Sequence, residues 1–343
     1  MTLLEVNDLR VHYETSEGPV QAVDGVTFSI DEGENLGIVG ESGCGKTTLA
    51  DAILGILEDN GHVAGGEILF RGEDLTEMSG AERRRIMWEE ISMIPQSAMN
   101  ALDPVYTMRD QIAEAIFAHR TTSNKEASAR VDELFELVGL DPERADDYPH
   151  QFSGGMRQRA MIAMALALEP AIILADEPTT ALDVIMQDQI LKRISALQDE
   201  INSSMMIITH DVSVVAETCD RVVVMYAGKI AEEGPAEAIF DKPYHPYSVG
   251  LKGAFPNIRK PNQDLVSIPG HPPELVNPPT GCRFADRCPL ATDVCYNEDP
   301  PEVTTNGLRT FCHHTDQIDS GFREGSDKRE TWERTKAARE VTR

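Results

Sequence analysis

Short apolar runs separated by glycines and acidic turns dominate the first hundred residues. Runs rich in β-branched and other apolar residues predict strands at Leu3–Arg10, Val26–Ile30, Glu34–Val39, Glu67–Phe70 and Ile91–Ile94. A helix is predicted over Lys46–Leu57. A second helix is predicted after Ser79, because Ser79 and Glu82 have the spacing of a capping box.

The spacing of apolar residues becomes helical between Ala101 and about Gln151. Two helix faces carry this pattern, formed by Ile112, Ala115 and Ile116 and by Val131, Leu134, Phe135 and Val138. Further along, Ala171–Ala175 and Met205–Thr209 have the length of buried strands, and Val184–Leu197 predicts a helix between them. Alternating strands and helices predict an α/β fold with a mostly parallel sheet core, an antiparallel β layer from the first strands, and a helical insert at about residues 97–165.

The composition changes after Phe240, where prolines crowd a short span of the chain. Such a span predicts an irregular, loop-rich extension, since proline removes a backbone donor and interrupts regular structure. The final stretch is charged and has no apolar stripe, which predicts a mobile tail. We therefore predict three parts, at residues 1–240, 241–316 and 317–343.

The chain is strongly acidic, with 58 acidic against 31 basic residues and a net charge of −27. This balance argues against a nucleic-acid partner, and we interpret it as adaptation to a salt-rich cytoplasm. No apolar stretch reaches the roughly 18–20 residues of a membrane span, because Glu169 and Pro170 end the longest one. The first residues lack the basic start and apolar run of a secretory leader. We expect a soluble chain that reaches a membrane only through partner subunits.

Residues 40–47 read Gly-Glu-Ser-Gly-Cys-Gly-Lys-Thr, which matches the phosphate-loop pattern G-x-x-x-x-G-K-[ST] between a predicted strand and a predicted helix. Backbone amides of such a loop and the following helix N-terminus attract phosphate. Lys46 would reach the outer phosphates and Thr47 would offer its hydroxyl to Mg²⁺, with Cys44 as a small filler. The candidate ATP-binding residues are Gly40, Glu41, Ser42, Gly43, Cys44, Gly45, Lys46, Thr47 and Thr48.

Two further stretches of the sequence contain residues that suit the binding or hydrolysis of phosphate groups. An apolar run ends in Asp176 and Glu177. An aspartate there can hold Mg²⁺ through water, and the next glutamate can polarise the attacking water. Ser153, Gly154 and Gly155 begin an amphipathic helix, so that a hydroxyl, two bare amides and a helix N-terminus form a second surface for phosphate.

With these motifs in this order, roughly Met1–Phe240 resembles the nucleotide-binding subunit of ABC transporters. The resemblance implies that two cassettes enclose two ATP molecules and that the signature Ser153–Gln158, including Gly154 and Gly155, serves the partner's ATP. It also implies that Tyr13 stacks on adenine and that Gln96 senses Mg²⁺ and γ-phosphate and acts in catalysis. Asp183 would lie in the Ala181–Asp183 loop that faces the dimer partner, and His210, as the switch histidine, would act in catalysis together with Glu177. Tyr13 as an ordinary strand aromatic and His210 as a structural histidine are the alternatives.

The later residues narrow the family. The segments His245–Tyr247, Gly281–Pro289 and Gln96–Pro104 resemble those of di- and oligopeptide importer ATPases, whose relatives import nickel or sugars. This resemblance implies two transmembrane permease subunits, a second ABC ATPase that is identical or homologous, an extracytoplasmic solute-binding protein, and a location at the cytoplasmic face of the plasma membrane. The alternatives are import of sugars or nickel and, in another class, a soluble ABC ATPase acting on ribosomes or DNA.

Four cysteines gather in the extension, at Cys282, Cys288, Cys295 and Cys312, with 5, 6 and 16 residues between them. No C-x-x-C pair occurs among them, which disfavours a zinc ribbon. Four thiolates suit a [4Fe–4S] cluster, and Cys288 precedes proline as ferredoxin ligands do. Some members of the family that the chain resembles carry such a cluster. Zinc, with His313 or His314 as substitute ligands, and unmetallated thiols remain the alternatives, whereas a reducing compartment argues against disulfides.

Overall fold

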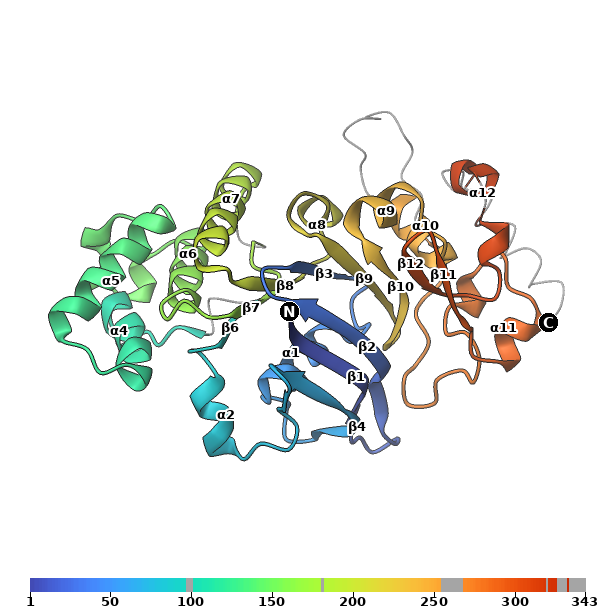
Figure 1. Cartoon of the computed structure of the whole chain (residues 1–343), viewed down its shortest axis with the longest axis horizontal. Coiled ribbons are helices and arrows are strands. Elements are labelled where there is room, and N and C mark those ends of the chain that lie inside the picture. Colours follow the sequence, from blue (N-terminus) through green and yellow to red (C-terminus); the bar gives the residue numbers. More distant parts are fainter. Residues whose placement is uncertain (97–100, 180–181, 254–267, 319, 326–331, 333–343) are drawn as a thin grey trace. The chain divides into compact units, whose positions relative to one another are not determined.

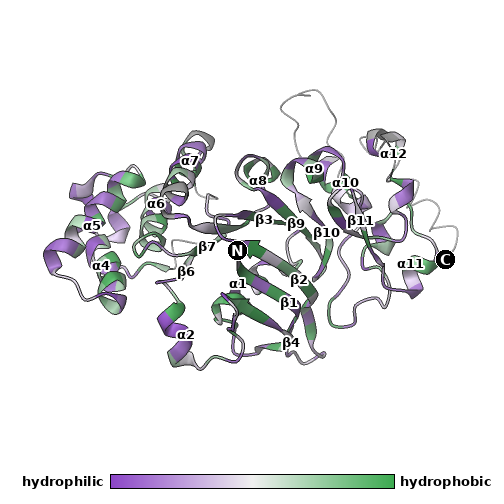
Figure 2. Cartoon of the chain, viewed as in Figure 1, coloured by the Kyte–Doolittle hydropathy of each residue, from purple (hydrophilic) through white to green (hydrophobic). Residues whose placement is uncertain are grey.

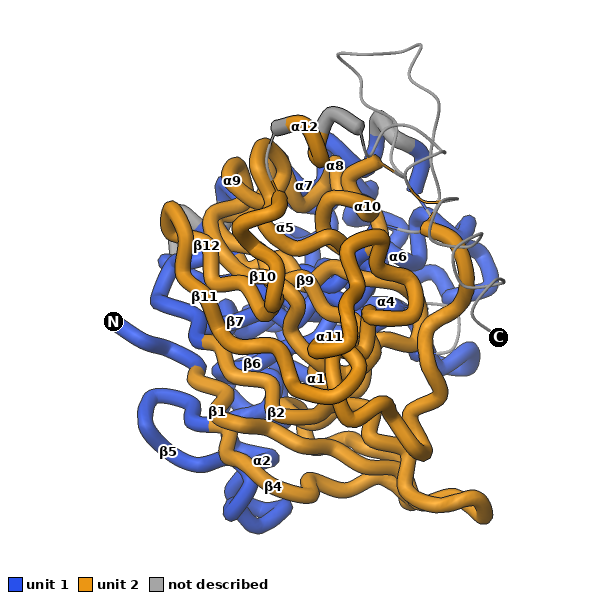
Figure 3. The backbone as a smooth tube through the Cα atoms, turned by 90° about the vertical axis from the view of Figure 1, so that its right-hand side faces the viewer, with its two compact units in different colours: residues 1–4, 29–35, 69–209 blue, residues 5–28, 36–68, 210–343 orange. Residues whose placement is uncertain are grey.

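Figure 1 shows the computed structural model of the chain, which describes residues 1–96, 101–179, 182–253, 268–318, 320–325 and 332. The backbone divides into two compact units (Figure 3). The first unit consists of Met1–Leu4, Ser29–Asn35 and Leu69–Thr209, and the second of Glu5–Phe28, Leu36–Ile68 and His210–Arg343. The predicted boundary at residue 240 lies inside the second unit, and the limits 1–240, 241–316 and 317–343 stay a prediction.

The first unit contains three parallel strands in the order β8-β7-β6. They are β6 (Ile91–Ile94), β7 (Ile172–Asp176) and β8 (Ser204–Ile208). Every residue of β7 and β8 is buried, as expected of parallel strands that are covered on both faces. The three predicted strands are therefore confirmed, with two of them shifted by one residue.

The helices of the first unit follow the predicted pattern closely. They are α2 (Gly80–Ile86), α4 (Met108–His119), α5 (Asn124–Leu137), α6 (Gly154–Ala165) and α7 (Val184–Ile201), with short 3-10 turns at Pro142–Asp146 and Pro149–Gln151. The capping box of Ser79 and Glu82 starts α2 as predicted. Helices α4, α5 and α6 pack together through the predicted apolar faces, in which Ile112, Val131 and Phe135 are fully buried. Residues 97–100 of the predicted insert lie outside the described residues.

In the second unit, β3 (Asn35–Val39) pairs in parallel with β9 (Arg221–Tyr226). Antiparallel pairs then add β10 (Lys229–Pro235), β12 (Leu308–Phe311) and β11 (Glu302–Thr305). Helix α1 (Lys46–Leu54) follows β3, and α8 (Val212–Thr218) and α9 (Ala236–Asp241) flank β9 and β10 in sequence. Helix α1 ends before the predicted Leu57, because Gly55 takes a left-handed conformation with φ of 70° and caps the helix.

The first strands form a separate layer, as predicted. Strands β1 (Thr2–Tyr13), β2 (Val20–Asp31) and β4 (Gly61–Phe70) lie in the order β2-β1-β4, and the short β5 (Glu73–Asp74) pairs antiparallel with the end of β4. Buried and less buried residues alternate along β1 and β2. This alternation is typical of a sheet with one buried face.

The C-terminal extension has more regular structure than its prolines suggest. It contains α10 (Pro246–Gly253), the 3-10 turn η3 (Ala285–Arg287), α11 (Asp293–Asn297) and the hairpin β11-β12, and a further turn at Thr315–Gln317 lies at its end. Helix α12 (Ser320–Gly325) lies beyond it, in the part predicted as a tail. Asn306 and Gly307 join the two strands with φ of 51° and 80°, as a tight hairpin turn requires. The expectation of an irregular extension is thus incomplete, since the hairpin extends the sheet beside β10.

One hydrophobic core joins the extension to the strands of the second unit. Its buried members from β9 include Val222, Val224 and Tyr226, and those from beyond residue 240 are Tyr247, Ile268, Phe284, Cys288, Leu308 and Trp332. Trp332 is 2% exposed although it belongs to the predicted mobile tail. Figure 2 shows the contrast between hydrophobic colouring along β3 and hydrophilic colouring on α2. Among the described residues, no helix has the length and apolar character needed to cross a bilayer.

Candidate nucleotide site and cysteine cluster

The glycine-rich loop lies between β3 and α1, where the sequence predicts it. A Cβ atom on Gly40 would come within 2.2 Å of the Met225 carbonyl oxygen, and one on Gly45 within 2.3 Å of the Ala22 carbonyl oxygen. Both positions have positive φ, of 155° and 100°. Only glycine satisfies both demands. Gly45 is the N-cap of α1 and offers no capping side chain, which leaves the first amides of the helix available to an anion.

Lys46 folds back over the loop. Its ammonium Nζ donates to the carbonyl oxygens of Gly40 at 2.8 Å and Glu41 at 3.0 Å, and lies 3.6 Å from Cys44 Sγ. Cys44 is buried, and burial raises the pKa of its thiol, as suits the predicted filler. Thr47 is exposed and Thr48 is half-buried, while Ser42 and Gly43 are exposed at the tip of the loop. The loop thus presents amides, a cation and a hydroxyl together.

The two predicted acids lie at the end of β7 in the first unit. Asp176 is the last residue of the strand and is buried. Glu177 follows with a φ of 48°, a conformation that a non-glycine residue adopts at a cost, and its amide donates to the Ile208 carbonyl at 2.7 Å. Residues held in such sparsely populated conformations cluster at functional sites, so the geometry supports a functional role for Glu177.

The predicted signature forms the start of α6, also in the first unit. Ser153 is the N-cap, and its Oγ accepts a hydrogen bond from the Met156 amide at 3.3 Å. Ser153 is exposed, and Gly154 and Gly155 form the first turn of the helix. Gln158 differs from these residues, because its side chain is 2% exposed and Nε2 donates to the Pro178 carbonyl at 2.8 Å. The amide of Gln158 therefore holds the segment after Glu177 rather than facing outward.

The remaining predicted residues divide between the units. In the first unit, Gln96 is exposed just after β6, and Asp183 is the exposed N-cap of α7, with Oδ1 accepting from the Met186 amide at 3.0 Å. Ala181 of the predicted dimer-facing loop lies outside the described residues. In the second unit, His210 is exposed after β8, and the Tyr13 ring at the end of β1 lies so close to Gly61 that a Cβ there would be 2.7 Å from it.

The four cysteines of the extension all lie in the second unit as free thiols. Burial raises the pKa of Cys282 to about 11 and that of Cys312 to about 12, and the neighbouring Cys295 adds to both shifts. Burial and the other three cysteines also raise the pKa of Cys288. The Cys282 amide donates to the Cys295 carbonyl at 2.8 Å. The four residues therefore share one neighbourhood.

This neighbourhood is not a formed metal site. Within the described part of the chain, no three histidine, cysteine or acidic side chains are arranged to hold a metal ion. The two histidines considered as substitute ligands have other partners, since His313 Nε2 lies 3.1 Å from the Glu298 carbonyl and His314 Nε2 lies 2.8 Å from Thr292 Oγ1. The donor set suits a cluster by its chemistry, because the buried thiols of Cys288, Cys295 and Cys312 and the half-buried thiol of Cys282 lose their protons readily only when a metal compensates the charge.

Sequence reasoning missed the residues that join the loop to the extension. Arg287 forms a two-pronged ion pair with Glu41, and the Tyr247 hydroxyl accepts a hydrogen bond from the Glu41 amide. In the sequence, the segments that contain Arg287 and Tyr247 stand out only for their resemblance to importer ATPases. Tyr247 and Arg287 lie 206 and 246 positions after Glu41, and no local pattern in the sequence indicates that they contact the loop.

The loop, the acids after β7 and the glycine-rich start of α6 are the features of an ABC-type ATPase. The family model described as "ABC transporter" matches residues 23–180, and the one described as "Oligopeptide/dipeptide transporter, C-terminal region" matches residues 231–295. A dimeric ATP-binding cassette solved in a post-hydrolysis state with ADP and Pi is similar in structure. It has a TM-score of 0.63 and 28% identity over 68% of this chain and 99% of that chain. The predicted fold class is confirmed.

Curated relatives cover nearly the whole chain. The dipeptide transport ATP-binding protein DppD of Bacillus subtilis is 47% identical over 319 residues, which are 92% of this chain and 95% of that protein. The oligopeptide transport ATP-binding protein OppD of Salmonella typhimurium is 44% identical over 313 residues, 90% of this chain and 93% of that protein. The chain belongs to the family of ATP-binding subunits of dipeptide and oligopeptide ABC transporters.

Proposed function

We propose that this chain hydrolyses ATP to power the import of di- or oligopeptides through a membrane permease. The observation that carries the proposal is the shared core of the second unit. There, the extension matched by the oligopeptide/dipeptide family packs against β9, the strand paired with the one that leads into the phosphate loop. The relatives named above are described as dipeptide and oligopeptide transport proteins, which favours peptides over nickel, sugars or a ribosomal role.

The proposed roles in ATP chemistry follow from the chemistry of each group. Amides of residues 40–48 and Lys46 would bind the phosphates, and Tyr13 would stack on adenine. Thr47, Asp176 and Gln96 would hold Mg²⁺, which neutralises charge on the transferred phosphoryl group. Glu177 would polarise the attacking water, and His210 would act as the switch histidine. Mutant ATPase assays on these residues test each role separately.

Membership of this family implies permease partners in the membrane and dimerisation of the ATPase. We further propose that Ser153, Gly154 and Gly155 bind the ATP of the partner ATPase. The support is that Ser153 is exposed at the N-terminus of α6 and that Gly154 and Gly155 after it are only partly buried. Asp183 would also take part in binding the partner's ATP. Gln158 would act indirectly, because its side chain holds the Pro178 carbonyl. A homologous or identical second ATPase and an extracytoplasmic solute-binding protein complete the proposed assembly.

Reconstitution tests the transport function directly. The chain would be purified with two permeases and its partner ATPase, placed in vesicles and supplied with ATP. Uptake of a labelled dipeptide, together with faster ATP hydrolysis, is the expected result. Uptake of nickel or a sugar under the same conditions, without peptide uptake, contradicts the proposed substrate. Stable association with ribosomes in place of permeases contradicts the importer.

We also propose that Cys282, Cys288, Cys295 and Cys312 bind a [4Fe–4S] cluster, with zinc as the alternative. The support is the gathering of four thiols in one unit and the raised pKa of three of them. A bound cluster would supply cross-links between η3, α11 and the end of β12, where the cysteines lie. Its role would be structural, since small domains that bury little surface often depend on a metal for folding.

The acidic composition supports one further proposal, adaptation to high salt. With a net charge of −27, self-repulsion opposes the compact state when screening is weak. The Debye length is ~3 Å at 1 M salt and ~10 Å at 0.1 M, so molar salt screens most of this repulsion. We expect a higher melting temperature in 2 M than in 0.1 M potassium chloride. Equal or greater stability in the dilute salt contradicts the proposal.

A further inference from the structure

We propose that Arg287 and Tyr247, two residues of the C-terminal extension, are positioning residues that hold the phosphate loop in its ATP-binding conformation through Glu41. The inference rests on the proposed role of residues 40–48 in binding ATP. All the residues concerned belong to the second unit. The contact they make is between the extension and the loop itself, at the position directly after Gly40.

The ion pair between Arg287 and Glu41 has the geometry of a strong interaction. Arg287 Nη1 lies 2.6 Å from Glu41 Oε2, and Nη2 lies 2.8 Å from Oε1. Charge-assisted bonds of this two-pronged kind are stronger and more directional than single ones. The Arg287 side chain is 5% exposed and that of Glu41 28%, so solvent screens the pair only in part.

Arg287 is itself held in place by the extension and by β9. Its Nε donates to the Pro269 carbonyl at 2.9 Å, Nη2 to the Ile268 carbonyl at 3.2 Å, and Nη1 to the Tyr226 hydroxyl at 3.2 Å. Each guanidinium nitrogen therefore has a partner. An arginine fixed in this way fixes the carboxylate that it binds.

Tyr247 holds the backbone of the same loop residue. Its buried hydroxyl accepts a hydrogen bond of 2.9 Å from the Glu41 amide. The ring packs against Tyr226, with 4.7 Å between ring centroids, and against Phe284 at 5.4 Å. Glu41 is thus bound at its amide by Tyr247, at its carboxylate by Arg287, and at its carbonyl by Lys46.

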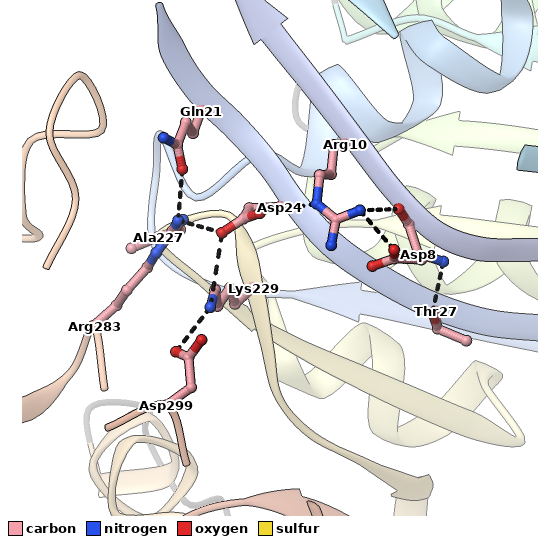
Figure 4. Close-up of polar contacts among 9 residues, drawn as sticks. All are labelled: Asp8, Arg10, Gln21, Asp24, Thr27, Ala227, Lys229, Arg283 and Asp299. Carbon is pink, nitrogen blue, oxygen red and sulfur yellow. Dashed lines mark hydrogen bonds and ion pairs between the residues drawn. The ribbon is translucent and has the colours of Figure 1, made fainter. Parts of the chain in front are cut away.

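A second contact connects the extension to the other side of the loop. Arg283 donates to the Ala227 carbonyl and, at 2.6 Å, to Asp24 Oδ2, as Figure 4 shows. The adjacent Gly228 amide donates to the Cys44 carbonyl in the loop at 3.0 Å. Arg283 lies two residues before η3 and Arg287 is its last residue, so the turn is anchored at both ends. The phosphate loop is therefore connected to the η3 turn by two sets of contacts, one through Arg287 and one through Arg283.

These contacts predict an effect on nucleotide affinity. Phosphate binding needs the loop amides in one arrangement, and a loop already held there loses less conformational freedom when ATP binds. Removing the contacts should raise the Kd and KM for ATP. The turnover number should change little, because neither Arg287 nor Tyr247 is proposed to touch the reacting atoms.

The experiment compares Arg287→Met, Glu41→Gln and the double variant in the assembled complex, with ATP titrated in binding and hydrolysis assays. We expect each single variant to weaken ATP binding about tenfold, and kcat of Arg287→Met to stay within about twofold of that of the unmodified protein. The double variant should be no weaker than the poorer single variant, since the two residues act as a pair. Tyr247→Phe, which removes one hydroxyl, should weaken binding about threefold.

Two controls separate the possible causes. Arg309→Met removes an extension arginine that pairs with Glu233 and does not contact the loop, and ATP affinity should be unaffected. Lys46→Ala should abolish ATP binding. If it does not, the assignment of residues 40–48 to ATP binding is wrong, rather than the proposed role of Arg287 and Tyr247. Unchanged Kd in folded Arg287→Met, or losses that add in the double variant, overturns the inference. If Arg287→Met does not fold, unchanged affinity in Tyr247→Phe and Glu41→Gln overturns it.

Discussion

The side-chain amide of Gln158 on α6 donates a 2.8 Å hydrogen bond to the backbone carbonyl of Pro178, one residue beyond Glu177. Gln158 is 2% exposed, so this bond is shielded from water. The family resemblance assigns Gln158 to the signature that faces nucleotide, but its buried amide holds the turn that carries Glu177. A residue of the signature and the proposed catalytic glutamate are therefore linked within one unit.

Replacing Gln158 with leucine should impair both folding and hydrolysis. The Pro178 carbonyl would lose its buried donor, at a cost of about 1–3 kcal/mol in the free energy of unfolding. The kcat for ATP should fall because Glu177 loses its support. Urea unfolding and steady-state ATPase assays measure the two effects. Gln189→Leu, at an exposed position on α7, is the matched control. Unchanged stability of Gln158→Leu would contradict this role.

Glu177→Gln should nearly abolish ATP hydrolysis while leaving ATP binding intact. The amide keeps the shape of the carboxylate but cannot polarise the attacking water, and the expected loss in kcat is about 10²–10³-fold. Rapid-quench hydrolysis and equilibrium ATP binding in the assembled complex measure the two properties. Glu114→Gln, an exposed change on α4, should have no effect on either. Near-normal hydrolysis by Glu177→Gln refutes the assignment.

The free energy of unfolding should decrease as the pH is lowered through the range in which His245 titrates. Burial lowers the pKa of His245 from 6.5 to about 3. Because the unfolded chain takes up the proton first, the contribution of neutral His245 to the free energy of unfolding is complete above pH 6.5. That contribution is lost as the pH falls toward 3, by about 1.4 kcal/mol per pH unit at most.

His245→Asn isolates this effect. Asparagine can accept the hydrogen bond that the Tyr247 amide donates to His245 Nδ1 at 3.0 Å, but it does not titrate. Glu232, whose carboxylate accepts from the His245 amide, is present in both proteins, and burial raises its pKa. Its opposite pH dependence therefore cancels in the difference between the two unfolding profiles. A difference that is constant from pH 7 to 4 contradicts the prediction.

Local patterns predicted the parts of the fold whose causes are local. The phosphate loop is defined by eight consecutive residues, and the continuous apolar runs of β7 and β8 reflect burial on both faces of the strands. The Asn306-Gly307 turn was also a local signal, since this dipeptide favours a tight hairpin, but the surrounding prolines concealed it.

The contacts that complete the site are of another kind. Glu41 and Arg287 are 246 positions apart, and their pairing depends on how the extension folds against β9 and β10. A charge pattern along the chain does not contain that information. Trp332 illustrates the same limit, because the charged residues around it predicted a mobile tail although its ring is buried in the core.

The cysteines give the last prediction, which concerns metal content. Anaerobically purified protein should contain about four irons and four sulfides per chain, with broad visible absorbance, as a cubane cluster requires. Cys295→Ser should lose the iron, because it removes one of four ligands, whereas Cys219→Ser, a change outside the extension, should retain it.

The core that contains Cys288 also contains Trp332, so loss of the cluster should shift tryptophan fluorescence to longer wavelength. Cys295→Ser should still bind ATP, and no more weakly than Arg287→Met does, since the phosphate loop contacts Arg287 and Tyr247 of the extension rather than any of the four cysteines. Stoichiometric zinc without iron would identify the alternative metal, and protein that is folded without either metal would contradict both.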